Sequence, residues 1–285
     1  MIESLRNKVR DSFPKNEGGS KSHHFSEDIF YIKEADISEL NETLYEPALC
    51  VVLQGAKQTS LDSRTLQLSA GDSVIISHHV PVYAKITQAS AEVPYLALII
   101  KIDRKIIQSL SFEIEQILEK QDRAFSIDSE RADRALIDTI ERFITTMEDP
   151  LEAELIGPSL FKELHLRVLR APHGGMLRQM VLSNSAANTI ARAIKHIRDN
   201  YRAGLLVTEV AREVGMSESS FYQKFREITG TTPHQYQKTV VTPKIRTALE
   251  RVSWSPYGAS IMANKQRNYS SEFKAKVVLE VISGN

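Results

Sequence analysis

The chain has 285 residues, and its 36 Lys and Arg are balanced by 36 Asp and Glu, so its formal net charge is zero. This length is enough for two compact domains. Hydrophobic residues make up 42% and charged residues 25%, as in an ordinary globular protein. No apolar run approaches the roughly 18 residues of a membrane-spanning helix, so no membrane partner is expected. A net charge of zero gives no indication of nucleic-acid binding, although an acidic domain would mask the charge of a small basic domain.

The N-terminal residues lack the apolar core of a signal peptide. Cys50 is the single cysteine, so no internal disulfide can form, and we predict a cytoplasmic location. Cys50 lies inside the apolar run Ala48–Leu53. We interpret it as a small core hydrophobe rather than a reactive thiol.

Residues 1–27 are predicted to be a loose N-terminal segment, because 14–23 are rich in Gly, Ser and Lys. Residues 28–102 have the pattern of β structure, with short apolar runs separated by turn residues. The runs are Ile29–Ile32, Leu49–Gln54, Ser73–Ser77, Val82–Ile86 and Tyr95–Ile102. Many short strands at this spacing predict a small antiparallel barrel or sandwich.

The turns of this segment are expected at Leu61–Arg64 and Ala70–Asp72. Pro81 and Pro94 are expected at strand starts or edges, because proline cannot donate a ladder hydrogen bond. Residues that line the barrel would alternate along its strands, for example in Leu49–Gln54, but the sequence leaves the choice of inward set open.

Residues 103–180 are predicted to be helical, because the apolar period changes from two to about 3.6. The apolar faces include Ile106, Leu110, Ile114, Ile117 and Leu118, then Leu136, Ile140, Phe143 and Ile144 within Asp128–Met147. A third helix runs to Arg170, and its regular part begins near Pro158. The run Pro172–Gly175 then ends the helical pattern. These helices either cover a core or form a dimerisation surface.

Residues 181–241 contain the most informative pattern. Ile190, Ile194, Ile197 and Tyr201 lie on one face of a helix that is expected to end near Gly204. Val207, Val210, Ala211 and Val214 form the inner face of a short second helix. Ala211 is small enough for the next helix to cross closely, and Gly215 stands where a sharp turn needs positive φ.

The helix after this turn is predicted from its own signals. Ser217 is its N-cap, Phe221 and Phe225 anchor it together with Ile228, and Gly230 ends it. Thr232-Pro233 starts another helix, as a cap followed by proline at the first turn. This is the arrangement of a DNA-binding helix-turn-helix, although a plain helical bundle with a solvated face would share the spacing.

The outward face of Ser217–Thr229 carries Ser219, Tyr222, Gln223, Lys224 and Arg226. Glutamine can bridge the N6 and N7 atoms of adenine, and hydroxyl groups can bond several base edges. Lys224 and Arg226 are expected to contact phosphates. Residues 189–241 hold eight Lys and Arg against five Asp and Glu, which suits a DNA-binding module.

Two stretches of the sequence carry motifs of a known family. The first is A-x-x-x-G-M-S-x-S-x-F-x-x-x-F-x-x-x-T-G-x-x-P-x-x-Y, which runs from Ala211 to Tyr236. The second comprises Leu49–Gly55, Ala70–Asp72 and Pro94–Leu98. Together they resemble the AraC/XylS family of transcription regulators, and the second is similar to the subgroup whose N-terminal domain is a cupin-like barrel. Leu169–Arg178 resembles the link of that subgroup into its DNA-binding domain.

This resemblance implies an α+β fold, with a cupin-like β-barrel over residues 28–102, a helical extension over 103–180, and an incomplete all-α helix-turn-helix domain over 181–241. It implies double-stranded promoter DNA as partner, an unknown small-molecule effector, and a homodimer; no cofactor is expected. The family's base-reading positions fall on Ser219, Tyr222 and Gln223. Leu206 departs from the family by standing where a Ser or Thr cap is usual, a change that costs about 0.5–2 kcal/mol.

Residues 242–285 depart further, because the family continues into a linker helix and a second helix-turn-helix. Pro243 would break that linker helix, and no second A-x-x-x-G follows. Met262–Asn285 instead resembles the start of an insertion-element transposase subunit. We infer an unrelated tail, disordered or partly helical, in a regulator truncated after its first helix-turn-helix; a divergent natural tail is the alternative.

Three functions follow from these features. The first is a promoter-binding regulator that responds to an effector. The second is a regulator whose DNA binding is impaired by the loss of the second reading helix; in its extreme form it binds no DNA and acts only by dimerising with intact homologues. The less favoured third function is a metal-dependent cupin enzyme. His78 and His79 are adjacent and would point to opposite faces of a strand, Glu92 lies beyond a loop, and His23-His24 lies in the loose segment. We therefore predict no metal site, no catalytic residues and no enzyme activity.

Overall fold

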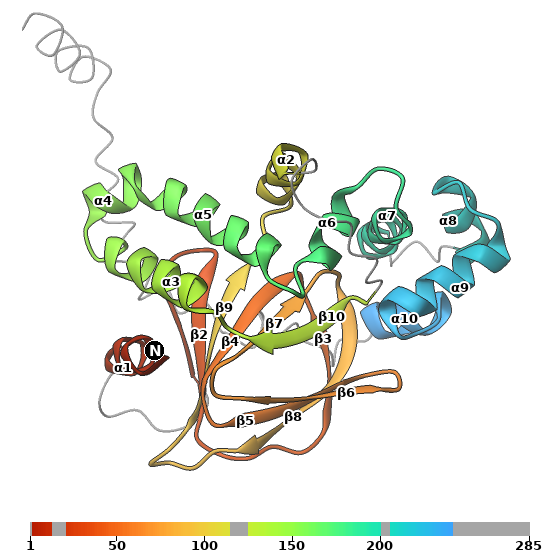
Figure 1. Cartoon of the computed structure of the whole chain (residues 1–285). Helices are drawn as coiled ribbons and strands as arrows, with labels where there is room; N and C mark the ends of the chain where they lie inside the picture. Colours follow the sequence, from red (N-terminus) through yellow and green to blue (C-terminus); the bar gives the residue numbers. More distant parts are fainter. Residues whose placement is uncertain (1, 13–20, 115–124, 201–205, 242–285) are drawn as a thin grey trace, which may run out of the picture. The chain divides into compact units, whose positions relative to one another are not determined.

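The computed structural model describes residues 2–12, 21–114, 125–200 and 206–241. Within these residues, one helix precedes nine consecutive strands, a second helix and a tenth strand follow, and helices alone make up the rest (Figure 1). The strands are β1 (Lys21–His24), β2 (Ile29–Glu34), β3 (Asn41–Tyr45), β4 (Ala48–Gln54), β5 (Ala56–Leu61), β6 (Arg64–Ser69), β7 (Asp72–Ile76), β8 (Val80–Gln88), β9 (Tyr95–Lys101) and β10 (Ile127–Arg131). The helices are α1 (Ile2–Asp11), α2 (Arg104–Ile114), α3 (Arg134–Thr146), α4 (Pro150–Leu155), α5 (Gly157–Arg170), α6 (Gly175–Val181), α7 (Ala186–Asp199), α8 (Val207–Glu213), α9 (Glu218–Thr229) and α10 (Pro233–Val241).

Two antiparallel sheets form the barrel. One has the strand order β1-β2-β9-β4-β7-β10 and the other the order β3-β8-β5-β6. The expected turns are present: Asp62 has φ +50 between β5 and β6, and Gly71 has φ +97 between β6 and β7. Pro81 is the second residue of β8, and Pro94 directly precedes β9. The antiparallel barrel or sandwich predicted from the strand spacing is confirmed.

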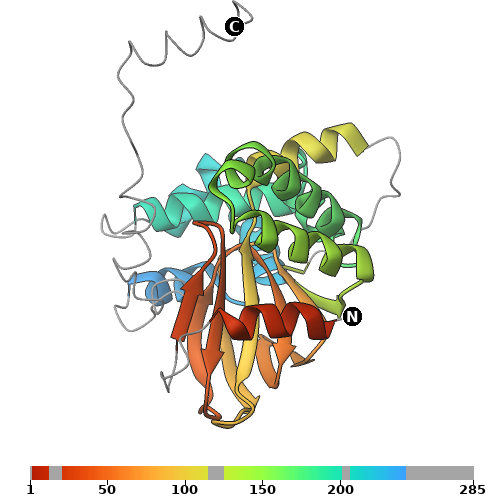
Figure 2. The ribbon, with the colours of Figure 1, turned by 90° about the vertical axis from the view of Figure 1, so that its left-hand side faces the viewer.

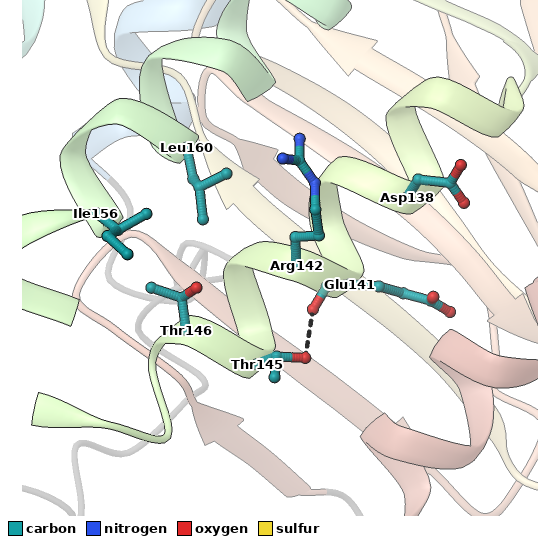
Figure 3. Close-up of a pocket in the computed structure, with 7 residues that line it drawn as sticks. All are labelled: Asp138, Glu141, Arg142, Thr145, Thr146, Ile156 and Leu160. Atoms are coloured by element: carbon teal, nitrogen blue, oxygen red, sulfur yellow. Dashed lines mark hydrogen bonds between the residues drawn. The ribbon is translucent and has the colours of Figure 1, made fainter. Parts of the chain in front are cut away.

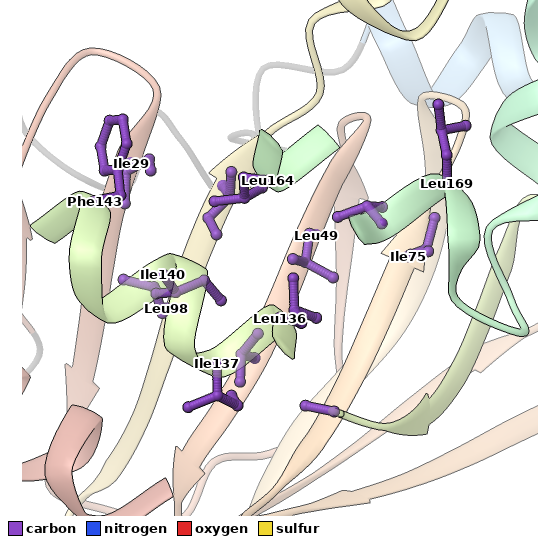
Figure 4. Close-up of a cluster of buried hydrophobic side chains, with 14 of the residues drawn as sticks. Ile29, Leu49, Ile75, Leu98, Leu136, Ile137, Ile140, Phe143, Leu164 and Leu169 are labelled. Atoms are coloured by element: carbon purple, nitrogen blue, oxygen red, sulfur yellow. The ribbon is translucent and has the colours of Figure 1, made fainter. Parts of the chain in front are cut away.

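The six-stranded sheet is buried on both faces, which explains its nearly continuous apolar strands. One face packs against helices: Leu49 and Leu98 belong to a core that also holds Leu136, Ile140 and Leu164 (Figure 4). The opposite face points between the sheets, where Ala48, Val74 and Ala97 form a second core. The alternation left open by the sequence is thereby resolved for each strand.

The helices of 103–180 act as the cover of this sheet. Figure 1 shows α3 and α5 lying across its strands, and their apolar faces join its outer core. The face predicted for the middle helix, Leu136, Ile140, Phe143 and Ile144, is buried as expected. Pro158 lies in the first turn of α5, also as expected. The predicted helix face around Ile117 lies outside the described residues.

Two expectations are wrong. Residues 1–27 are not a loose segment throughout, because α1 lies across the strands and buries Leu5 and Val9, one turn apart, in the outer core (Figure 2). Asp128–Arg131 is not the start of a helix but part of β10, which pairs antiparallel with β7. The helix begins after Asp133, whose carboxylate accepts a 2.7 Å hydrogen bond from the amide of Leu136. The cap residue, rather than the preceding charged run, sets this boundary.

The four helices α7, α8, α9 and α10 share a separate core. It contains Ile190, Val210, Ala211, Phe225 and Tyr236. The predicted face of the first helix is buried at Ile190, Ile194 and Ile197, while Tyr201 and Gly204 lie outside the described residues. None of the helices in the described ranges combines the length and apolar character that crossing a membrane requires.

Candidate nucleic-acid interface and barrel cavity

The turn between α8 and α9 has the geometry that the sequence predicts. Gly215 has φ +77, and a Cβ built there would meet no atom within 4 Å. The requirement for glycine is therefore set by the backbone conformation and not by crowding. Ser217 caps α9, since its hydroxyl accepts a hydrogen bond of 3.4 Å from the amide of Ser220.

Two phenylalanine rings hold α9 in place. Phe221 and Phe225 are fully buried, and their ring centroids lie 5.5 Å apart. The ring of Phe225 also packs edge-on against Tyr236 of α10 at 5.5 Å. Ala211 is buried beneath them, and Gly230 ends the helix with φ +71. Because these anchors occupy one face of α9, the other face is fixed toward the outside.

The opposite face carries the residues predicted to read bases. Ser219, Tyr222, Gln223 and Arg226 follow at intervals of three and four and so form one stripe. Ser219 and Gln223 are exposed. Tyr222 is half-buried, with its ring 5.9 Å from that of His234, which limits its freedom while leaving it at the surface.

Glu227 is a functional neighbour that the sequence analysis missed. Its carboxylate accepts hydrogen bonds from Gln223 Nε2 at 2.9 Å and from Lys224 Nζ at 2.7 Å. The bond from Lys224, followed by that from Gln223, lowers the pKa of Glu227. One residue expected to read a base and one expected to contact phosphate thus share a single anionic partner in the unbound protein.

Two further positions singled out by the sequence analysis are Arg226 and Leu206. Arg226 lies 3.8 Å from the carboxylate of Asp62, at the turn between β5 and β6. Leu206 precedes α8 in the N-cap position, is 60% exposed and makes no capping side-chain bond. The first amide groups of α8 therefore lack the side-chain acceptor that a serine or threonine would supply.

The barrel encloses a cavity of about 70 Å³ between its two sheets. Most of its wall is apolar, with Phe30 and Ile32 from β2, Val74 and Ile76 from β7, and Ile99 from β9. The polar lining residues are Tyr45, Glu46, Cys50, Lys57, Thr59 and Lys101. An apolar cavity with a few polar groups is the usual form of a small-molecule site.

Cys50 lines this cavity and is partly accessible rather than fully enclosed. Desolvation raises the pKa of its thiol to about 11, with a smaller opposing effect from Lys57. The thiol is therefore neutral near pH 7, in keeping with its interpretation as a small apolar side chain.

The histidine pair considered for a metal lies in the connection between β7 and β8, not on a strand. His78 Nε2 lies 2.9 Å from the carbonyl oxygen of Ala187, and Nδ1 lies 2.8 Å from the hydroxyl of Ser77. Because a carbonyl can only accept, Nε2 carries the proton and both ring nitrogens are used. Burial lowers the pKa of His78 to about 4 and that of His79 to about 3. The described ranges hold no group of three metal-ligating side chains.

A larger, open hollow of about 600 Å³ lies between α3 and the start of α5 (Figure 3). Its walls combine the acidic Asp138 and Glu141 with Arg142 and with the apolar side chains of Ile156 and Leu160. The guanidinium of Arg142 also pairs with Glu163 at 2.5 Å. The adjoining helix α4 exposes Leu151 and Leu155.

Several solved structures share features of this chain. ToxT from Vibrio cholerae with bound unsaturated fatty acid is 10% identical, with a TM-score of 0.33 over 82% of this chain and 100% of its own. The AraC-like transcriptional activator CuxR is 15% identical, with a TM-score of 0.35 over 84% of this chain and 88% of its own. A cupin superfamily protein from Desulfitobacterium hafniense is 21% identical, with a TM-score of 0.25 over 32% of this chain and 84% of its own.

Two family models match the sequence itself. Residues 27–176, more than half of the chain, match the AraC-type transcriptional regulator N-terminus. Residues 197–238 match the bacterial regulatory helix-turn-helix proteins of the AraC family. A search of the curated proteins found no match. The chain belongs to the AraC-type transcriptional regulators, with the N-terminal domain of that family followed by its helix-turn-helix.

Proposed function

We propose that this regulator binds promoter DNA in the bacterial cytoplasm by inserting α9 into the major groove. Ser219, Tyr222 and Gln223 contact base edges, and Lys224 and Arg226 contact phosphates. The burial of Phe221 and Phe225 is the observation that carries this proposal, because it fixes which face of α9 is presented. We assign no catalytic residue, metal or cofactor to the chain.

The order of residues along α9 supports the division of roles. In helix-turn-helix proteins, the N-terminal residues of the second helix reach the bases. Ser219 is the second residue of α9, and Gln223 follows one turn later on the same face. Gln223 suits a two-point contact with adenine, whereas the cations further along orient the helix on the backbone.

The second part of the proposal is that discrimination between sequences is weak. The described residues 206–241 hold one helix-turn-helix, and the family match to this part of the chain covers 197–238. Specific binding is typically about 4–10 kcal/mol stronger than non-specific binding, and each base pair contributes about 1–3 kcal/mol. One reading helix supplies only part of this difference. The expected tail at 242–285 lies outside the described residues.

We propose that a second copy of the chain restores part of the specificity by presenting two reading helices. The surface around α4 suits self-association, because Leu151 and Leu155 are exposed beside a hollow that contains both acidic side chains and Arg142 (Figure 3). Apolar side chains next to charges of both signs allow a two-fold contact. Sedimentation of Leu151→Glu, compared with wild type, tests this: an unchanged mass distribution would remove α4 from the interface.

The experiment for DNA reading begins with selection of duplexes from a random library by the full chain. Affinities for the enriched sequence are then measured by fluorescence anisotropy over a series of salt concentrations. Gln223→Ala and Ser219→Ala should change the preference at single base positions, each by about 1–3 kcal/mol. Lys224→Gln should weaken binding to all sequences alike and reduce the salt dependence by about one counterion.

An exposed residue of α10 provides the control for these variants. Gln235→Ala removes a glutamine side chain outside the stripe on α9 and should leave base preference unchanged. The proposal fails if no sequence is enriched and the stripe variants bind random DNA as wild type does. Strong enrichment with specificity in the usual range of about 4–10 kcal/mol would support α9 but contradict weak discrimination.

A further inference from the structure

A side chain from outside α9 contacts the stripe of residues proposed to read bases. His234 is the second residue of α10, and its ring centroid lies 5.9 Å from that of Tyr222, with 56° between the two ring planes. Aromatic rings whose centroids lie about 4.5–7 Å apart attract each other when they are not face to face. His234 is exposed and Tyr222 is half-buried, so their contact lies at the surface of the helix-turn-helix.

The backbone that carries His234 is held on both sides. Pro233, the residue before it, is buried, and Tyr236, two residues after it, is fully buried and packs edge-on against Phe225 of α9 at 5.5 Å. The hydroxyl of Thr232 caps the first turn of α10 by accepting a 3.3 Å hydrogen bond from the amide of Gln235. The first turn of α10 is therefore fixed against α9, and it presents the imidazole ring from a rigid support.

The hydroxyl of Tyr222 lies at the end of a long side chain, so a small rotation of the ring displaces it far. The preceding residue, Phe221, faces the core and meets the ring of Tyr222 edge-on, with centroids 6.4 Å apart. The contact with His234 is shorter and comes from another helix, so it restrains rotations that α9 alone permits. Burial, followed by the charge of Glu218, raises the pKa of Tyr222. Its hydroxyl therefore stays neutral and can both donate and accept a hydrogen bond.

We propose that His234 is a positioning residue for base reading. Its imidazole ring holds the phenol ring of Tyr222 in one orientation on the outward face of α9, so that the hydroxyl meets one base pair in one geometry. A side chain that is ordered before binding loses less conformational entropy on DNA, and it tolerates fewer alternative bases. This inference rests on the proposed function, and it extends the reading surface from α9 to the first turn of α10.

The test uses the full chain and the duplex enriched from the random library. Each base pair of this duplex is replaced in turn, and the ratio of the affinities for the original and the replaced duplex measures discrimination at that position. Tyr222→Phe removes the hydroxyl and keeps the ring that contacts His234. The base pair at which Tyr222→Phe loses discrimination is therefore the one that Tyr222 reads.

His234→Ala should reduce discrimination at that same base pair about two- to tenfold, which is the factor that one aromatic contact supplies. Discrimination at the positions read by Ser219 and Gln223 should not change. His234→Phe keeps a ring at this position and should restore discrimination. Tyr222→Phe combined with His234→Ala should discriminate no worse than Tyr222→Phe alone, because both changes act through one hydroxyl. Gln235→Ala, at the next residue of α10, is the matched control and should discriminate as wild type.

Three results would overturn the inference: wild-type discrimination in His234→Ala, a loss that His234→Phe does not restore, or a weakening that is equal for all duplexes. The last result is expected if the imidazole contacts a phosphate or only supports the fold, and urea denaturation of each variant separates those two cases. The proposed function survives all three results as long as Tyr222→Phe alters discrimination at one base pair. If no duplex is enriched, or if Tyr222→Phe changes nothing, base reading by Tyr222 is contradicted and the inference fails with it.

Discussion

The guanidinium of Arg226, on α9, lies 3.8 Å from the carboxylate of Asp62, on the turn between β5 and β6. A cation expected to contact phosphate therefore has a protein anion beside it in the absence of DNA. Both side chains are largely exposed, so the pair itself stabilises the fold little. Its effect is expected on DNA affinity, because phosphate and Asp62 compete for one guanidinium.

Asp62→Asn should therefore tighten binding to DNA of any sequence, by a factor of less than about ten. The amide keeps the shape of the turn and removes the competing charge. Anisotropy titrations at two salt concentrations measure the change. Arg226→Gln should weaken binding in the same assay, and the double variant should match Arg226→Gln alone. If Asp62→Asn still strengthens binding in the Arg226→Gln background, the competition does not act through Arg226.

Glu227→Ala should also tighten DNA binding, because it removes an anion from the DNA-facing side and the acceptor that holds Lys224 and Gln223. Unlike Asp62→Asn, this change should alter base preference, since Gln223 gains freedom to reach a base. Selection from a random library compares the two variants. Identical preferences in wild type and Glu227→Ala would show that Glu227 does not restrain Gln223.

The two N-caps of the helix-turn-helix offer a matched pair of stability changes. Ser217→Ala removes the acceptor for the amide of Ser220 and should lower the free energy of unfolding by about 0.5–2 kcal/mol. Leu206→Ser supplies the missing acceptor at the start of α8 and removes a 60% exposed leucine, so it should raise that energy by a similar amount. Urea denaturation measures both. A loss of stability in Leu206→Ser would show that its side chain has a packing role.

Phe225→Ala should cost about 3–5 kcal/mol, because the ring is fully buried between Phe221 and Tyr236. DNA binding should be lost together with folding of α9. Phe225→Leu retains much of the volume and should restore binding at a smaller cost in stability. If Phe225→Ala left both stability and DNA binding intact, the ring would not be what seats the reading helix.

Acid should destabilise the protein through His78 and His79. Burial holds the pKa of His78 near 4 and that of His79 near 3, both below the ordinary value of 6.5. At pH values between these lowered pKa values and 6.5, the unfolded chain binds more protons than the folded one. The free energy of unfolding therefore decreases as pH falls from about 6.5 toward 4.

Each histidine contributes at most about 1.4 kcal/mol per pH unit to this decrease. Urea denaturation at a series of pH values measures the slope. His78→Gln keeps a donor for the carbonyl of Ala187 and should flatten the slope, whereas His234→Gln, at an exposed position, should not. A slope in His78→Gln as steep as in wild type would mean that His78 takes up no proton on unfolding.

The sequence predicted the strands of the six-stranded sheet, which is buried on both faces, better than those of the four-stranded sheet. The strands β4 and β9 are continuous apolar runs, which burial on two faces requires. The strands β3, β5 and β6 were missed, because their sheet has polar outward residues and their short runs resemble loops. The strand β10 was read as helix, since its charged residues gain β structure only by pairing with β7.

The helix-turn-helix was predictable because its signals are local. Gly215, Ser217 and the phenylalanine spacing act within a few residues of one another. The contacts of Arg226 with Asp62 and of Lys57 with Tyr45 join residues from different elements, and no local pattern reveals them. Lys57 and Lys101 were missed as cavity residues because the inward set of each strand depends on the pairing register.

The apolar core on the outer face of the six-stranded sheet limits which fragment of the N-terminal domain can be studied in isolation. Leu5, Leu136 and Leu164 come from three helices distant in the sequence, yet all cover the same strands. A fragment that spans only the barrel strands would expose the apolar outer face of the six-stranded sheet to water and would precipitate. A stable fragment has to retain α1 and all residues as far as Val181. The N-terminal domain is therefore a unit of roughly two-thirds of the polypeptide.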